Sequence, residues 1–520
     1  MALSRWYRAV HAPDPSRGSL RNRCRRSRAG IAAALVAALG FAVHCGHPPA
    51  AAERPLRIAL NSGPFTLDPH AGELLTLSVL RNLYDALTAF DAGNRVRPAL
   101  AESWENPDEL TWIFHLRRGV SFHDGSEFTA RDVLFSFDRA RRAPASEIGT
   151  YLVAIDKVLA LDAHTVEITT RRPYSILLNK IAFVLIVPAG SPPAISRPVG
   201  TGPYRLDADE PGKRLALRAF PGYWGGAASV RRVEFLPLSD HTARVRGLLD
   251  GDLDVAAEPS VADVRRIRAA RGCRIAERTS LGVTYLVLRS DRQPLADPRT
   301  RRALSLALDR GALVRQALRG EGEPIGQMVT RNVFGFAPDI PPPVAAPAAS
   351  RALLAAAGHA GGLDLSLQIR PGVRPELDAL TRQLLGVGIR VHAVERPLES
   401  FTPDVDLSFA SWFCLSGDAS DFFDALAHSP ARGNGYGSGN FASYRNPALD
   451  ALIEDSEATL NMLTRRVQLE HSMHVVMGDQ VFIPLYSTPI LYGVREAVDW
   501  QPRSDDLILV NTIHRRAVHG

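Results

Sequence analysis

Short runs in which apolar and polar residues alternate predict strands at several places along this chain of 520 residues. Residues 111–116 and 363–369 alternate in this way, and the alternation is typical of a strand with one buried face. The short run at 56–60 predicts an opening strand. Strands are therefore expected in both halves of the chain.

Apolar residues at helical spacing predict helices between these strands. Thr129 precedes Asp132 by three positions, the spacing of a capping box, and an apolar helix face follows. Four further helices are expected over residues 297–310, 351–357, 446–460 and 465–477. Helices that alternate with strands indicate α/β lobes, and the chain is long enough for a large core and two or three lobes.

Three segments are expected to be turns or loops. His123, Asp124 and Gly125 supply turn chemistry, because glycine tolerates the positive φ that tight turns require. A His–Asp pair could also perform acid–base chemistry, but we favour the turn. Prolines at 341–343 restrict the backbone and favour an extended loop. The glycine-rich segment 433–440 is not a phosphate loop, because no Gly-Lys-Ser/Thr sequence follows it.

The net charge of +6 comes from the beginning of the chain. Residues 1–52 hold eight arginines and one acid, Asp14, whereas the remainder carries 53 basic and 54 acidic residues. Such a balanced remainder gives no reason to expect nucleic acid or an anionic membrane as a partner. The leader combines a basic region, an apolar stretch over 31–43 and small residues at 50–52, as a cleavable signal peptide does. We therefore expect residues 1–52 to be a signal for export to the periplasm.

Cysteine usage adds few constraints. Cys45 could suggest a lipoprotein, but His44 is larger than the residue usually found before a lipidated cysteine, so lipid anchoring is disfavoured. Cys273 and Cys414 remain after cleavage of the signal. Exported proteins can form disulfides, and the sequence leaves open whether these two residues pair.

A series of short motifs occurs in the order found in one protein family. The motifs lie at residues 66–69, 82–87, 100–104, 111–125, 129–137, 198–204, 221–224, 297–299, 353–358, 444–447 and 483–486. In this order the chain resembles the family 5 extracellular solute-binding proteins, which serve ABC importers of dipeptides, oligopeptides and nickel. The resemblance covers nearly all of residues 55–490 and rests on the order of the motifs rather than on any one of them.

The resemblance implies a two-lobed α/β clamp, like class II periplasmic binding proteins, with an extra α/β subdomain in the first lobe. The first lobe is expected to comprise residues 53–89, 197–283 and 485–520, the subdomain residues 90–196, and the second lobe residues 284–484. Such clamps close around a solute by a hinge motion and present the closed form to a permease. Closure needs no cofactor and no chemical step, so we do not expect an enzyme.

The resemblance also implies that segment 407–423 lines the ligand cleft. In peptide-binding relatives, the backbone around the residue that matches Trp412 pairs with the peptide as an added strand. Some of these relatives carry a disulfide that involves the position of Cys414. The expected ligand-binding residues are Ser62, Tyr285, Ser411, Trp412, Phe413, Cys414, Leu415, Asp418 and Asp421.

One position in this segment departs from the family pattern. Peptide-binding relatives hold the α-ammonium of the peptide with a carboxylate where this chain has Leu415. A charge-assisted hydrogen bond contributes about 1.5–3 kcal/mol, so its loss would weaken the binding of a free amine roughly tenfold to a hundredfold. Either Asp418 or Asp421 recovers the contact, or the ligand lacks a free α-amine, and we favour the second interpretation. Both acids could instead be solvated loop residues near a helix start.

Other functions fit the sequence less well. An exported hydrolase is disfavoured, because the chain has neither a His-Glu-x-x-His nor a Gly-x-Ser-x-Gly motif. His471 and His474 share a helix face, where histidines are more often surface residues than metal ligands. A receptor for an opine, sugar or metal complex, or a ligand sensor, would use the same clamp.

We therefore expect a monomeric, periplasmic binding component of a peptide-type ABC importer. Its expected partners are a peptide or peptide-like solute and the permease and ATPase of the inner membrane. No nucleic-acid partner, metal site or cofactor is expected.

Overall fold

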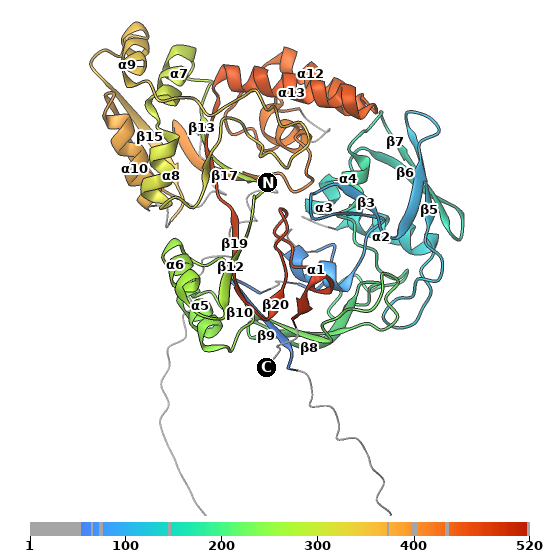
Figure 1. Ribbon diagram of the computed structural model, residues 1–520. Coiled ribbons are helices and arrows are strands. Elements are labelled where there is room, and N and C mark those ends of the chain that lie inside the picture. Colours follow the sequence, from blue (N-terminus) through green and yellow to red (C-terminus); the bar gives the residue numbers. More distant parts are fainter. Residues whose placement is uncertain are drawn as a thin grey trace, which may run out of the picture.

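The computed structural model describes residues 54–63, 66–71, 76–143, 147–371, 374–396, 404–431 and 436–516. The predicted signal peptide, residues 1–52, lies outside these ranges, as do residues 433–435 of the glycine-rich segment. The described chain forms two lobes, and a subdomain lies beside the first (Figure 1).

A seven-stranded sheet forms the centre of the first lobe, in the order β12-β19-β11-β1-β10-β9-β8. Its strands are β1 (Leu56–Leu60), β8 (Tyr204–Glu210), β9 (Arg214–Ala219), β10 (Arg232–Pro237), β11 (Val255–Ala257), β12 (Cys273–Arg278) and β19 (Ile490–Arg495). Strand β1 is parallel to both β10 and β11. The helices here are α1 (Leu77–Leu83), α5 (His241–Asp250) and α6 (Val261–Ala269). Two short antiparallel strand pairs, β2 (Thr88–Phe90) with β3 (Val96–Pro98) and β20 (Val498–Asp499) with β21 (His514–Arg515), complete it, together with the 3-10 turn η4 (Val510–Thr512).

A six-stranded sheet forms the centre of the second lobe, in the order β14-β18-β13-β17-β15-β16. Its strands are β13 (Gly282–Leu288), β14 (Glu323–Pro324), β15 (Leu363–Ile369), β16 (Ile389–Glu395), β17 (Leu407–Phe413) and β18 (Phe482–Ser487). Its helices are α7 (Pro298–Ala307), α8 (Arg310–Ala317), α9 (Pro347–Ala356), α10 (Arg374–Leu385), α11 (Ser420–Phe422), the π-helical turn η3 (Phe423–Ala427), α12 (Pro447–Ala458) and α13 (Met462–Asp479). Alternate residues of β13 enter two different hydrophobic clusters, since Leu286 packs in one and Tyr285 and Val287 pack in the other.

The subdomain carries an antiparallel sheet in the order β4-β5-β7-β6. Its elements are β4 (Ala101–Glu105), β5 (Thr111–Leu116), α2 (Ala130–Arg142), α3 (Glu147–Thr150), β6 (Ile155–Asp162), β7 (Thr165–Thr170) and α4 (Leu177–Ile181). The hydrophobic core of the subdomain is continuous with that of the first lobe. The two parts therefore share one packed interior.

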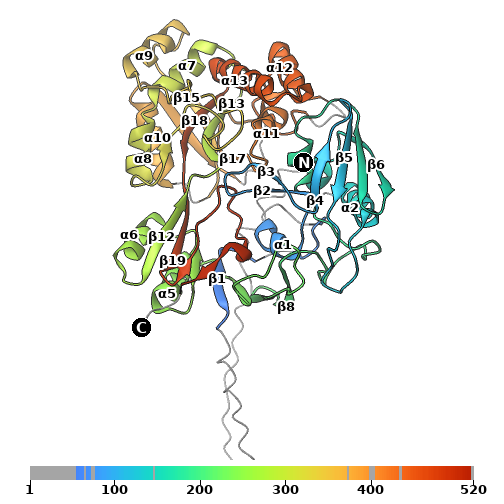
Figure 2. The same cartoon turned by 45° about the vertical axis from the view of Figure 1, so that its right-hand side comes forward.

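The chain passes between the two large sheets twice. It goes from β12 to β13 through residues 279–281 and returns from β18 to β19 through residues 488–489. In Figure 1 both crossings lie at the left of the molecule, and the subdomain lies at the right. Figure 2 shows the two crossings side by side from a second direction.

Most elements predicted from the sequence pattern are confirmed. Strands at 56–60, 111–116 and 363–369 have the predicted bounds. Helix α2 begins with the expected capping box between Thr129 and Asp132. The single helix predicted over 297–310 was wrong, because the backbone becomes extended at Leu308 and Asp309 then caps a second helix by accepting a hydrogen bond from the Ala312 N–H at 2.8 Å.

The turn at His123 has a structural role. The Gly200 N–H donates to Nδ1 of His123 at 3.2 Å, which leaves Nε2–H to donate to the Gly202 carbonyl at 3.0 Å. Asp124 accepts hydrogen bonds from the Ser126 N–H and hydroxyl at 3.0 and 2.7 Å. The His–Asp pair therefore orders the turn and attaches it to the glycine motif at 200–202, as the turn interpretation predicted.

Candidate functional site

The predicted cleft segment 407–423 comprises strand β17, a loop and helix α11. Strand β17 pairs with β13, so Ser411 lies opposite Thr284 and their hydroxyls are 3.1 Å apart. In the same register Tyr285 faces Ala410 and Phe413 faces Gly282. The pairing thus brings together four of the predicted site residues, Tyr285, Ser411, Trp412 and Phe413.

Tyr285 is a core residue of the second lobe. Its side chain is 3% exposed and lies in the cluster that contains Phe482, whose ring centroid is 6.0 Å away. Burial raises the pKa of its phenol. Its predicted contact with a ligand remains a prediction, and this packing does not favour it.

Trp412 and Phe413 are better placed for contact with a solute. Trp412 is half-buried against the second-lobe core, and its indole N–H has no acceptor among the residues that the structure describes. Phe413 is 40% exposed at the end of β17. The indole N–H of Trp412 is covered by protein, so what this end of β17 offers a solute is apolar surface, chiefly that of Phe413.

The two cysteines do not form a disulfide in this structure. Cys273 is a buried free thiol in β12 of the first lobe, and Cys414 is a buried free thiol in the second lobe. The Cys414 thiol donates to the Asp418 carbonyl at 2.9 Å, and burial raises its pKa. Leu415, next in the chain, is half-buried and packs against the hydrophobic cluster of the first lobe. Leu415 therefore reaches from one lobe to the other.

Asp418 forms an ion pair within its own lobe. Its carboxylate accepts hydrogen bonds from both terminal nitrogens of Arg465, at 2.6 and 2.8 Å, and from the Ser420 N–H and hydroxyl. Burial alone would raise the pKa of Asp418, but the Arg465 guanidinium outweighs burial and lowers it. The carboxylate is ionised and already paired.

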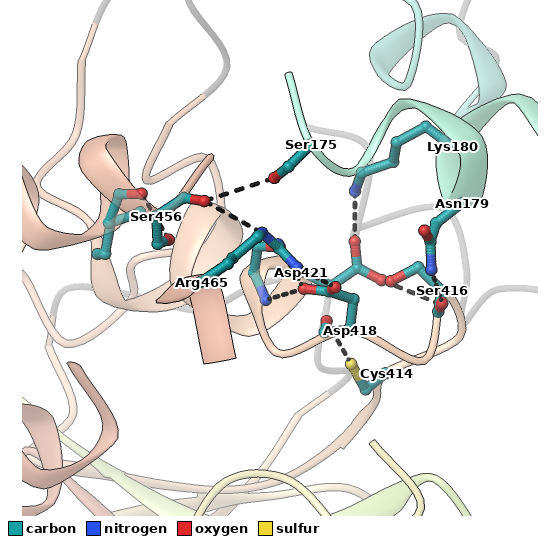
Figure 3. Close-up of polar contacts among 11 residues, drawn as sticks. Ser175, Asn179, Lys180, Cys414, Ser416, Asp418, Asp421, Ser456 and Arg465 are labelled. Carbon is teal, nitrogen blue, oxygen red and sulfur yellow. Dashed lines mark hydrogen bonds and ion pairs between the residues drawn. The ribbon is translucent and has the colours of Figure 1, made fainter. Parts of the chain in front are cut away.

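Asp421 is paired across the lobes. One carboxylate oxygen forms an ion pair with Lys180 of the subdomain, and the other accepts from the Ser416 N–H at 3.1 Å (Figure 3). The alternative that Asp418 and Asp421 are solvated loop acids is therefore wrong, because both side chains are buried in ion pairs. Neither carboxylate has an oxygen free of a protein donor.

On the first lobe, Ser62 lies where the parallel strands end. It is half-buried, and its hydroxyl donates to the Asn61 side-chain oxygen at 3.2 Å. The Asn61 amide in turn donates to Glu258 at 2.9 Å, and Glu258 follows strand β11 directly. Ligands of α/β folds bind outside the carboxyl ends of parallel strands, which is where Ser62, Asn61 and Glu258 lie.

A second acid lies close to Glu258. Asp506 accepts a 2.6 Å hydrogen bond from the Tyr492 hydroxyl. Burial by the surrounding protein, together with the negative charge of Glu258, raises the pKa of Asp506 to about 7. Both residues nevertheless have solvent-exposed surface. Sequence reasoning missed both, and only the position of Glu258 after a short apolar run gave a signal.

The partners of the predicted acids were also missed. Lys180 stands alone in the apolar run 176–187, a pattern that indicates a buried lysine in need of an anion. Arg465 was predicted only as part of a helix, and nothing in the sequence pointed to Asp418 as its partner.

The histidines on α13 do not form a metal site in the described ranges, where no cluster of three or more His, Cys, Asp or Glu side chains could hold an ion. His474 instead contacts Asp339 at 3.0 Å. Among the described residues no helix is both long enough and apolar enough to cross a bilayer.

Known proteins resemble this chain in sequence and in fold. Residues 95–434 match the model of the bacterial extracellular solute-binding proteins, family 5 Middle. The dipeptide-binding protein of Escherichia coli K12 is 28% identical over an alignment of 442 residues, which covers 76% of this chain and 82% of that protein. Heme-binding protein A of Haemophilus influenzae is 26% identical over 452 residues, 78% and 81% of the two chains. The structure of HbpA2 from Haemophilus parasuis, 21% identical, matches 89% of this chain and 100% of its own with a TM-score of 0.79.

Proposed function

This chain belongs to the bacterial extracellular solute-binding proteins of family 5, and on that premise we propose that it captures a peptide or peptide-like solute and delivers it to an ABC permease. The proposed location is the periplasm, and the predicted signal peptide supports it. We further propose that the protein acts as a monomer, with lobe ranges close to those predicted above but divided at the crossings 279–281 and 488–489, so that all of β13 and β18 belong to the second lobe.

The observation that carries this proposal is the way the lobes are joined. Only two crossings, of three and two residues, connect the described strands of the two large sheets. Short paired crossings can act as a hinge, because a few residues absorb the change in backbone angles while both sheets stay rigid. Leu415 reaches the first-lobe cluster from the second lobe, so closure would bury it together with a solute.

The side chains of segment 411–415 favour a solute whose end near Leu415 is uncharged. Asp418 and Asp421 already neutralise Arg465 and Lys180. Moving either carboxylate to meet a ligand ammonium would leave a buried cation unpaired, which is strongly unfavourable. Phe413, 40% exposed at the end of β17, adds apolar surface to this part of the segment.

The test is mass spectrometry of the mature protein under native conditions, followed by mild denaturation to release what it carries. A peptide-like amide without a free α-amine is the expected result, and a free-amine peptide would contradict the uncharged end near Leu415. A single solute without amide bonds would contradict the peptide-like ligand while leaving the clamp intact. If the released solute is a free-amine peptide, an acid other than Asp418 and Asp421 must bind its ammonium. Glu258 and Asp506 are then the acids to mutate.

A further inference from the structure

The subdomain and the second lobe meet along a seam that is rich in polar contacts. The subdomain contributes residues 172–180, and the second lobe contributes the loop 416–421 and the end of α12. The Asn179 amide donates to the Ser416 carbonyl at 2.8 Å, and the Ser175 N–H donates to the Glu457 carbonyl at 2.9 Å. Figure 3 shows Ser175, Asn179 and Lys180 on the subdomain side, pointing toward these partners.

A buried ion pair lies at the centre of this seam. Lys180 and Asp421 are 6% and 7% exposed. Although burial lowers it, the Asp421 carboxylate raises the pKa of Lys180 well above its ordinary value, and the nearby Asp424 acts in the same direction. Lys180 is thus the cation that balances the second-lobe carboxylate of Asp421 across the seam.

A second ion pair extends the seam. Arg172 of the subdomain contacts the carboxylate of Glu457, which also accepts a hydrogen bond from the Tyr436 hydroxyl at 2.5 Å. The Arg172 guanidinium lies 4.9 Å from the centroid of the Tyr436 ring. Both ion pairs therefore place a subdomain cation on a second-lobe anion.

Arg465 holds the second-lobe half of the seam together. While its terminal nitrogens bind Asp418, its Nε donates to the Ser456 carbonyl at 3.1 Å. The same Ser456 carbonyl accepts from the Ser175 hydroxyl at 3.4 Å (Figure 3). Arg465 is therefore a positioning residue, which fixes the loop and the end of α12 as one surface.

The backbone also approaches closely at this seam. Gly417 has φ of +71° and lies against Asn94, which follows β2 of the first lobe. A Cβ at Gly417 would lie 1.9 Å from the side-chain nitrogen of Asn94 and 3.0 Å from the backbone carbonyl oxygen of the same residue. The fit leaves no room for a side chain, as expected of two surfaces in direct contact.

We infer that this seam is a latch, formed when the lobes close and parted when they open, which sets the population of the closed form. The inference rests on the proposed hinge closure. The seam lies on the subdomain side, away from the two crossings (Figure 1), so a small rotation at the crossings separates it by a large displacement. When the lobes open, the side chains of Lys180 and Asp421 both become hydrated, and neither then requires the other as a counter-ion.

The test is the Lys180→Met variant in protein stripped of solute by unfolding and refolding. In the closed form this change leaves Asp421 buried without its cation, whereas in the open form Asp421 is hydrated. We expect the ratio of open to closed molecules to rise roughly tenfold or more. The ratio is read from the distance between spin labels at Asp138→Cys and Val467→Cys, which are exposed on the subdomain and the second lobe.

Lys157→Met is the matched control, because it makes the same substitution at an exposed site of the same subdomain. Asn179→Ala is a milder second variant, should Lys180→Met fail to fold, and it should shift the ratio in the same direction. Equal populations in a folded Lys180→Met and in Lys157→Met would overturn the latch alone. The unmodified protein is measured with its solute retained and again after stripping. If the spin-label distance is the same in both states, hinge closure and the latch are both overturned.

Discussion

At the scale of single residues, Arg465 is a fully buried charge with several protein partners. It is fully buried and bound to Asp418, Ser420 and Ser456. We expect Arg465→Met to lower the free energy of unfolding by about 3 kcal/mol or more, since it leaves a buried carboxylate without its cation. Chemical denaturation measures the change, and the exposed neighbour Arg466 supplies the control Arg466→Met. Equal effects of the two substitutions would contradict this account of the pair.

A second residue-scale prediction concerns Leu415. Leu415→Asp places a carboxylate where the side chain packs between the lobes. A ligand ammonium would then be its partner, so the affinity for free-amine dipeptides should rise by roughly tenfold. Isothermal titration with a set of dipeptides and their N-acetylated forms measures the change. The acetylated forms are the control, and a rise for both forms, or for neither, would contradict the proposed position of Leu415 in the cleft.

Asp506 gives a prediction about pH. Because its pKa is raised from 3.8 to about 7 in the folded protein, folding favours its protonated form. The unfolded chain releases this proton at lower pH, so stability is lost as the pH rises from about 4 to 7. Asp506→Asn should therefore raise the melting temperature more at pH 8 than at pH 5. The exposed Asp378→Asn is the control, and a pH-independent shift in Asp506→Asn would contradict the raised pKa.

The sequence could identify which acids matter but not what they bind. Asp418 and Asp421 stood out because they follow a motif, whereas their partners, Arg465 and Lys180, lie 47 and 241 residues away in the chain. Pairings at such separations follow from the packing of whole elements, which a local pattern does not encode. The position of Lys180 within an apolar run indicates a buried charge. It does not indicate that the partner anion belongs to the other lobe.

At the scale of elements, two sequence motifs are explained by one contact. Gly202 packs directly on the backbone of Leu83 and Tyr84 at the end of α1, and a Cβ there would lie 2.5 Å from the Leu83 carbonyl carbon and 2.7 Å from the Tyr84 nitrogen. Backbone cannot move aside as a flexible side chain can. The motif at 198–204 thus requires glycine because it lies against the motif at 82–87.

We therefore expect Gly202→Ala to destabilise the first lobe by about 3 kcal/mol or more. Gly478→Ala, near the end of α13, is the control, because an added Cβ there meets no atom within 4 Å. Alanine in a helix should stabilise slightly, by about 0.5–1 kcal/mol. Urea denaturation followed by tryptophan fluorescence measures both, and a tolerated Gly202→Ala would contradict the close approach.

The pattern of apolar and polar residues predicted an element well where burial of that element determines the pattern. Alternation fixed the bounds of β5 and β15, and a short run of apolar residues fixed those of β1. The break between α7 and α8 was missed, because Asp309 fits a helical pattern as well as a cap. Local patterns could not predict which strands pair, because β13 pairs with β17 and β18, which lie more than a hundred residues away in the chain.

At the scale of the whole molecule, membership of a solute-binding family favours binding over the rival exported hydrolase. The fold agrees with that role, because two rigid sheets joined by two short crossings can move as bodies. The dipeptide-binding and heme-binding relatives differ in their named ligands, so family membership leaves the ligand to the residues of the cleft.

The last prediction concerns the shape of the whole protein. If the crossings at 279–281 and 488–489 act as a hinge, the radius of gyration should be smaller with solute bound than after stripping. Small-angle scattering of the protein as purified, after refolding, and with the released solute restored measures this directly. The seam between Lys180 and Asp421 adds a second expectation, that Lys180→Met remains expanded at solute concentrations that compact the unmodified protein. Equal radii in all states would mean that the two lobes do not move, and that solute enters a preformed site.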